Sequence, residues 1–192
     1  MLFARSGLKK QKDGYLKKIK VIQEKHKSFK ASVKPKSLNL SSEEELTYYT
    51  EWIHSAIRLL SEIDKYQTVE NLSEKLKVDT SQIRQSAEFL NSIGLVSYKN
   101  GTVKGLKNNL HLEKSSPLTY LRQLTWRMKA LENFQRKNKE DYTFNALVTL
   151  EEKQMQKIKE ILKEGVAKAG AEVEKTKAPE EMMCLNIDFF RV

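Results

Sequence analysis

The chain has 192 residues, and its 35 lysines and arginines against 25 acids give a net charge of +10. A chain of this length buries a core without a structural metal, and the single cysteine, Cys184, excludes an internal disulfide framework. No apolar run is long enough to cross a membrane, and no secretory signal opens the chain. We therefore expect a cytoplasmic protein with no membrane partner.

The positive charge is concentrated at the N-terminus. Residues 1–40 hold 12 basic and 2 acidic side chains, whereas the rest of the chain holds 23 of each. Residues 12–25 place Tyr15, Ile19 and Ile22 at helical spacing opposite lysines, which predicts a basic amphipathic helix followed by a tether. Its lysines either contact phosphates without sequence preference or form a solvated helix face. The candidate phosphate contacts are Lys9, Lys10, Lys12, Lys17, Lys18 and Lys20.

Residues 41–112 contain the clearest local signals. Residues 41–45 (SSEEE) predict overlapping capping boxes, and an apolar stripe to Ile63 predicts one helix of about 23 residues after them. Two short helices follow, opened by Thr68 and by Asp79 and joined by a tight turn. Gly94 ends the second, and Asn100-Gly101 between β-prone segments predicts a two-residue hairpin with a type I′ turn.

The order helix, turn, helix, hairpin in residues 68–106 resembles a winged helix-turn-helix. In that arrangement the second helix presents polar side chains to base edges, and lysines of the hairpin reach phosphate. The candidate DNA-binding residues are Ser81, Gln82, Arg84, Gln85, Lys99 and Lys104. Residues 68–106 carry a net charge of only +1, however, so a structural or protein-contact role is the alternative.

Residues 113–192 predict a helix, a strand, a helix and a strand. The first helix starts at Ser116-Pro117 and runs to about Lys137. Residues 142–148 have the β-prone composition of a strand, and residues 183–189 alternate apolar and polar side chains as strands do. A capping box of Thr149 with Glu152 opens the long helix between them. The order strand, helix, strand implies a crossover that makes the two strands parallel. Two parallel strands alone need a further neighbour in the sheet, either the hairpin or the strands of a second subunit, and we favour a homodimer.

The predicted fold is thus mostly α with small β (α+β), a winged helix-turn-helix unit followed by a strand-helix-strand module. We expect three parts: a basic linker helix and tether in residues 1–40, a long helix with the winged unit in residues 41–112, and a dimerisation or sensing module in residues 113–192.

The chain lacks the residue patterns of an enzyme. His26, His54 and His111 are far apart, Cys184 has no neighbour at metal-ligand spacing, and no phosphate-binding or nucleophile motif is present. We expect no catalysis, no cofactor and no metal. Trp52, His54 and Trp126 are candidates for an effector pocket between the long helices, with ordinary helix-helix core as the alternative.

Four segments carry a resemblance that extends from about residue 10 to the end. They are residues 49–58, residues 93–96 leading into Asn100-Gly101, residues 121–134 and, most specifically, residues 185–190 (LNIDFF). The chain resembles the C-terminal domain of a family of uncharacterised bacterial regulators, in which a repressor-like helix-turn-helix precedes a conserved domain of unknown function. By this resemblance, we expect the sequence to correspond to the family from its linker helix onward, without a match to that helix-turn-helix. The resemblance implies transcriptional regulation but transfers no ligand or catalytic residue.

Two hypotheses follow for the function. In the first, the chain is a non-enzymatic bacterial regulator of transcription that acts as a dimer and binds DNA. In the second, it is an interaction or adaptor module that binds a protein partner and no nucleic acid, as the near-neutral body after residue 40 favours.

Overall fold

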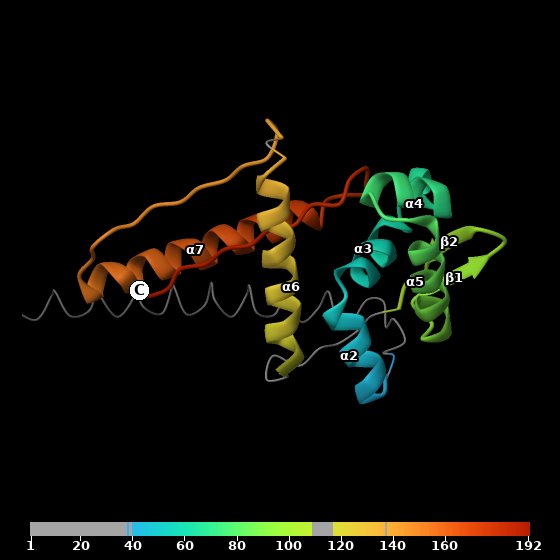
Figure 1. The fold of residues 1–192 in the computed structure, drawn as a ribbon. Helices are drawn as coiled ribbons and strands as arrows, with labels where there is room; N and C mark the ends of the chain where they lie inside the picture. Colours follow the sequence, from blue (N-terminus) through green and yellow to red (C-terminus); the bar gives the residue numbers. More distant parts are fainter. Residues whose placement is uncertain (1–37, 39, 109–116, 137) are drawn as a thin grey trace, which may run out of the picture. The chain divides into compact units, whose positions relative to one another are not determined.

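A computed structural model describes residues 38, 40–108, 117–136 and 138–192 of the chain (Figure 1). The predicted basic helix and its six candidate lysines lie outside these residues. Within them, six α-helices, α2 to α7, accompany a 3-10 helix and one two-stranded antiparallel sheet, which confirms a mostly helical α+β protein. Residues 39–107 and 111–192 belong to one compact unit, to which the following description applies.

Two short helices occupy the region where the sequence predicts one of about 23 residues. α2 (Ser42–Thr50) begins with the predicted capping box, and α3 (Trp52–Leu60) follows after Glu51, whose φ of −105° and ψ of 109° are extended. The Thr50 hydroxyl donates to the Leu46 carbonyl at 2.9 Å, a bond that bends helices. The prediction of one helix was wrong because the chain is extended at Glu51; α2 packs on α6, whereas α3 packs mainly on α5 and less on α6.

The predicted pair of short helices is present. After the 3-10 helix η1 (Asp64–Tyr66), α4 (Val69–Leu76) is capped by Thr68, and α5 (Thr80–Ser92) follows a turn in which Lys77 is left-handed with φ of 56°. Asp79 is the N-cap of α5 as predicted, although its side chain makes no capping hydrogen bond.

The predicted hairpin is confirmed as β1 (Val96–Lys99) and β2 (Thr102–Gly105). Asn100 and Gly101 have φ of 50° and 77°, as a type I′ turn requires. Backbone contacts fix the hairpin beside the start of α4: Thr68 forms an antiparallel bridge with Thr102, and the Val69 N–H donates to the Gly101 carbonyl at 3.0 Å.

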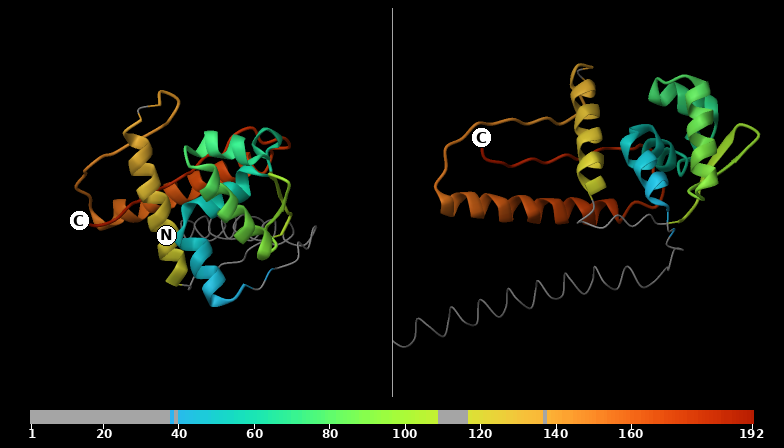
Figure 2. Two further views of the ribbon diagram at one scale, coloured as in Figure 1. Left: turned by 45° about the vertical axis from the view of Figure 1, so that its right-hand side comes forward. Right: turned by 60° about the horizontal axis from the view of Figure 1, so that its bottom comes forward.

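The core lies between α3, α4, α5 and the hairpin (Figure 2). Its fully buried side chains are mostly aliphatic, with Ser61 among them, and come from one face of each helix and from one side of the hairpin. The largest are Ile53, Ile57, Leu60, Val69, Leu72, Ile83, Leu90, Leu95, Val96 and Val103.

The C-terminal half differs from its prediction. α6 (Pro117–Phe134) and α7 (Glu152–Val173) confirm the two helices, but α7 follows Glu151 without a side-chain cap, so the predicted Thr149–Glu152 capping box does not form. Residues 142–148 and 183–189 belong to no sheet, and the predicted strand-helix-strand module was wrong for the described chain. A strand requires a hydrogen-bonding neighbour, and neither segment meets one within the described residues.

Candidate functional site

The four candidate residues on α5 lie together on one exposed face. Ser81, Gln82, Arg84 and Gln85 are exposed, whereas Ile83, Ala87 and Leu90 on the opposite face are buried. The apolar face packs on α3, α4 and β1 and so fixes the direction in which the polar face points. These side chains supply hydroxyl, amide and guanidinium groups to solvent at the N-terminal end of the helix.

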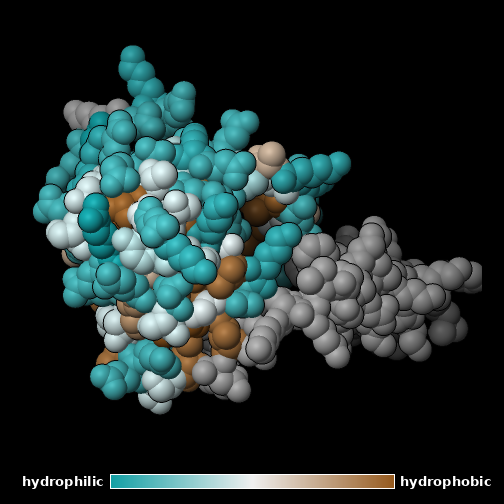
Figure 3. Space-filling view, turned by 90° about the vertical axis from the view of Figure 1, so that its right-hand side faces the viewer, coloured by the Kyte–Doolittle hydropathy of each residue, from teal (hydrophilic) through white to brown (hydrophobic). Residues whose placement is uncertain are grey.

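The two candidate lysines of the hairpin also lie on a common face. Lys104 pairs with Ser97 and Lys99 pairs with Thr102 in the antiparallel ladder, and directly paired residues point to the same side of a sheet. Both lysines are exposed, whereas Val96 and Val103 on the other side are buried. Figure 3 faces the hairpin side of the molecule and shows a largely hydrophilic surface with separate apolar areas.

Charge on this surface is partly balanced. An Arg84 guanidinium nitrogen lies 3.6 Å from a Glu70 carboxylate oxygen, with both side chains more than half exposed. An exposed pair of this kind contributes little stability and exchanges readily for another partner. A shallow depression next to it is lined by Ser73, Lys77 and Gln82 together with Val78 and Asp79 of the turn. The surface is polar and only weakly basic.

His54 is a core residue, 7% exposed, and packs between two rings. Its ring centroid lies 4.7 Å from that of Phe89 and 6.5 Å from that of Tyr48. The Nδ1 atom is buried without a hydrogen-bond partner, and burial lowers the pKa of the imidazole to about 4. The same environment raises the pKa of Tyr48 to about 12, chiefly through burial. His54 is therefore neutral at pH 7.

The two tryptophans have other neighbours. The Lys129 ammonium of α6 lies 3.8 Å from the Trp52 ring centroid, a cation–π contact across the α3–α6 interface. The Trp126 carbonyl accepts a hydrogen bond from Asn186 at 3.4 Å. Trp52 thus meets α6, whereas His54 packs on Tyr48 and Phe89. Their assignment to an effector pocket stays a prediction.

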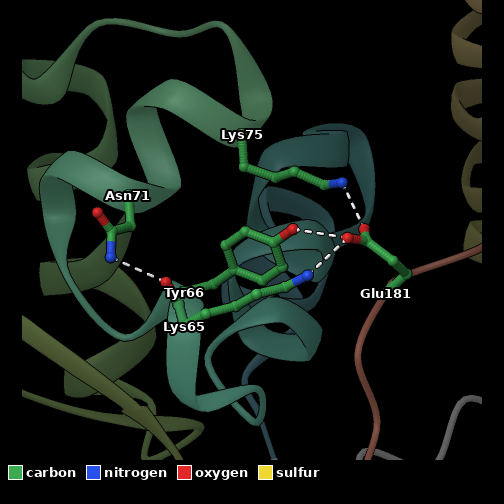
Figure 4. A network of polar contacts seen from close by, with 5 residues as sticks. All are labelled: Lys65, Tyr66, Asn71, Lys75 and Glu181. Carbon is green, nitrogen blue, oxygen red and sulfur yellow. Dashed lines mark hydrogen bonds and ion pairs between the residues drawn. The ribbon is translucent and has the colours of Figure 1, made fainter.

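A cluster around Glu181 has no signal in the sequence (Figure 4). Glu181 Oε1 accepts from the Lys65 ammonium at 2.8 Å and from the Tyr66 hydroxyl at 2.9 Å, and Oε2 pairs with the Lys75 ammonium. These three hydrogen bonds lower the pKa of the Glu181 carboxyl to about 2. Because more than a hundred residues separate Glu181 from its partners, no local pattern predicts the cluster.

The segment after α7 makes a second ionic contact farther along. Arg127 Nε of α6 donates to both carboxylate oxygens of Asp188, at 2.9 and 3.0 Å, and an Arg127 NH2 group pairs with the same carboxylate. Cys184, between the two contacts, is exposed as a residue, but neighbouring atoms partly desolvate its thiol and so raise the thiol pKa. A raised pKa favours the protonated thiol, which is a poor nucleophile and metal ligand.

Within the part of the chain that the structure describes, no three histidine, cysteine or acidic side chains converge as metal ligands. A helix long and apolar enough to cross a membrane is also absent from the described residues.

Comparison with known proteins gives one family. A domain of unknown function (DUF4423) matches residues 30–192, which include every element described above. No curated protein and no solved structure matches the chain. Because the match spans most of the sequence, the chain belongs to the DUF4423 family.

Proposed function

We propose that this chain is a non-enzymatic regulator of transcription in the bacterial cytoplasm, in which α4, α5 and the β1–β2 hairpin bind DNA as a winged helix and the C-terminal segments join two copies. The observation that carries the DNA-binding part is the exposed polar face at the N-terminal end of α5, held outward by its buried apolar face. A helix that presents its N-terminal polar side chains in this way suits the major groove.

The anchoring of the hairpin supports the same reading. A wing must hold its lysines at a fixed position relative to the recognition helix to contact phosphate while that helix meets base edges. Here the Val103 N–H donates to the Gln67 carbonyl at 2.7 Å and the Gly105 N–H to the Ser61 carbonyl at 3.2 Å. The hairpin is therefore attached along its second strand to the segment before α4, and β1 packs on α5.

The test compares Arg84→Ala with Arg136→Ala, which removes an equal charge from an exposed position after α6. A preferred duplex is first selected from a random pool with the wild-type protein, and affinities are then measured across a salt series. We expect Arg84→Ala to lower affinity for the selected duplex about tenfold or more and to relax its sequence preference. Lys104→Ala should weaken all duplexes alike. Failure to bind any duplex at about 50 mM salt, or equal effects of the two arginine variants, contradicts the proposal.

Exposed apolar side chains in the C-terminal half support dimerisation. In residues 142–150, Tyr142 is 89% and Leu147 is 88% exposed, α7 has no buried residue, and Phe190 is 76% exposed. Large apolar side chains that stay exposed in this way are typical of a surface that binds another protein. The extended segments also leave backbone groups without a ladder.

In such a dimer, the equivalent segments of the second copy cover this apolar surface. Light scattering should give about twice 22.3 kDa, the mass of one chain. Phe144→Asp places a charge on the face shared by Tyr142 and Val148, and we expect it to give a monomer. Thr143→Asp adds the same charge to the opposite face of that segment and serves as the control. A wild-type monomer at high concentration, or equal dissociation by both variants, overturns the dimer.

A protein-interaction module without DNA binding is the second candidate, and the low charge of the α5 surface favours it. The ion pair between Arg84 and Glu70 offsets the positive charge of Arg84 on that face. Replacement of the six candidate lysines of the N-terminal segment by glutamine separates the two functions. Loss of duplex binding in this variant supports the DNA regulator. A wild-type protein that binds no duplex but still forms the dimer supports the interaction module.

A further inference from the structure

We propose that Lys65, Tyr66 and Lys75 form a binding site for a phosphate group, and that the Glu181 carboxylate of the same chain fills this site. Two ammonium groups and one hydroxyl converge on the two oxygens of this carboxylate, and all three are hydrogen-bond donors directed at one point (Figure 4). Phosphate is an anion with more acceptor oxygens than a carboxylate, and lysine binds it as a point charge. The inference is independent of the DNA-binding face on α5.

The three donors are held in place by η1 and α4 themselves. The Tyr66 ring lies between them, with the Lys65 ammonium 4.8 Å and the Lys75 ammonium 5.3 Å from its centroid. Asn71 of α4 donates to the Lys65 carbonyl at 2.8 Å, and the Asn71 N–H donates to the Thr68 hydroxyl at 3.2 Å. These contacts are local in sequence, so the donors remain grouped when Glu181 departs.

Glu181 itself is attached more weakly. It belongs to the extended segment after α7, which forms no sheet, and its side chain is 44% exposed. The next ion pair of that segment is at Asp188. Among the described residues, Glu181 is the acid paired with both Lys65 and Lys75. Its removal leaves two positive charges around one phenol ring, an arrangement that an external anion stabilises.

Protonation does not empty the site under ordinary conditions. The donors keep the pKa of Glu181 at about 2, so the carboxylate stays charged at neutral and mildly acidic pH. Glu181 therefore leaves only when an anion competes for the donors or when the extended segment moves. A tethered carboxylate has a high effective concentration at its site, so the wild-type protein should bind free phosphate weakly.

The test titrates inorganic phosphate into the full chain at constant ionic strength and follows the amide NMR signals of Tyr66 and Lys75. We expect Glu181→Gln and Glu181→Ala to lower the apparent dissociation constant about two- to tenfold, the range that two partly exposed ion pairs represent. Glu180→Gln removes an equal charge from the neighbouring residue and should behave as the wild type. Adding Lys65→Gln and Lys75→Gln to Glu181→Gln should abolish the response.

A short duplex identifies the source of the phosphate. Displacement of inorganic phosphate from the Glu181→Gln protein by DNA assigns the site to the DNA backbone, and the salt slope of duplex binding then steepens by about 1. Absence of displacement assigns it to a free phosphate group. Equal dissociation constants of Glu181→Gln and Glu180→Gln for phosphate overturn the inference. A wild-type protein that binds phosphate with the dissociation constant of Glu181→Gln also overturns it. Neither result concerns Arg84, so the DNA-binding proposal stands or falls separately.

Discussion

The buried imidazole of His54 makes the stability of the fold depend on pH. Burial lowers its pKa to about 4 in the folded protein, whereas the model value for an exposed histidine is 6.5. The unfolded chain therefore binds a proton at a higher pH than the folded chain does. The contribution to stability is fully present above pH 6.5 and is lost as the pH falls from 6.5 towards 4.

The size of the effect follows from these two values. The pKa of His54 is 6.5 in the unfolded chain and about 4 in the folded chain, so His54 takes up a proton on unfolding below pH 6.5. This proton uptake lowers the free energy of unfolding by about 2 kcal/mol between pH 7 and pH 5. His54 has no carboxylate partner that would offset this loss, since desolvation is the cause of its shift. The Nδ1 atom has no hydrogen-bond partner either.

Urea unfolding followed by circular dichroism at pH 7, 6 and 5 measures the loss. The control is His54→Phe, which keeps a ring between Tyr48 and Phe89 but cannot titrate. The other two histidines, His26 and His111, are present in both proteins, so the difference between the two pH profiles isolates His54. His54→Leu provides a smaller replacement in case the larger ring does not fit. Parallel profiles for wild type and both variants would refute the reasoning.

Three further substitutions test the packing and the caps by thermal melting. In Gly105→Ala the new Cβ would lie 2.6 Å from Glu62 Cγ, so we expect a loss of about 1–3 kcal/mol; an unchanged melting temperature would contradict this packing. Thr68→Ala removes the hydroxyl that accepts from the Asn71 N–H and should cost about 1 kcal/mol, whereas Thr68→Ser should retain most of the cap. Ile57→Ala creates a cavity at a fully buried position and should cost about 2–5 kcal/mol, and a smaller loss would mean that the core collapses around it.

Local signals predict most of the region from α4 to β2. Thr68 caps α4, Gly94 has φ of 73° after α5, and Asn100-Gly101 forms the two-residue turn. Each depends on residues within a few positions of one another, so the signals of caps and tight turns can be recognised from the local sequence alone. The same holds for the capping box of Ser41 with Glu44, which the structure contains in full.

Contacts between segments distant in the sequence decide the features that the local signals do not predict. The apolar stripe continues on both sides of Glu51, yet the helix breaks there, and only its second half packs on α5. The composition of residues 142–148 and the alternation in residues 183–189 indicate β-structure, but neither pattern supplies a neighbour to accept the ladder hydrogen bonds. The convergence of Lys65 and Lys75 on Glu181 depends on where the chain returns after α7. Sequence by itself determined the caps of α2 and α4, the hairpin turn and the apolar faces of the helices. The tertiary structure decided which faces and charges meet, because pairing distant segments depends on the packing of the whole chain.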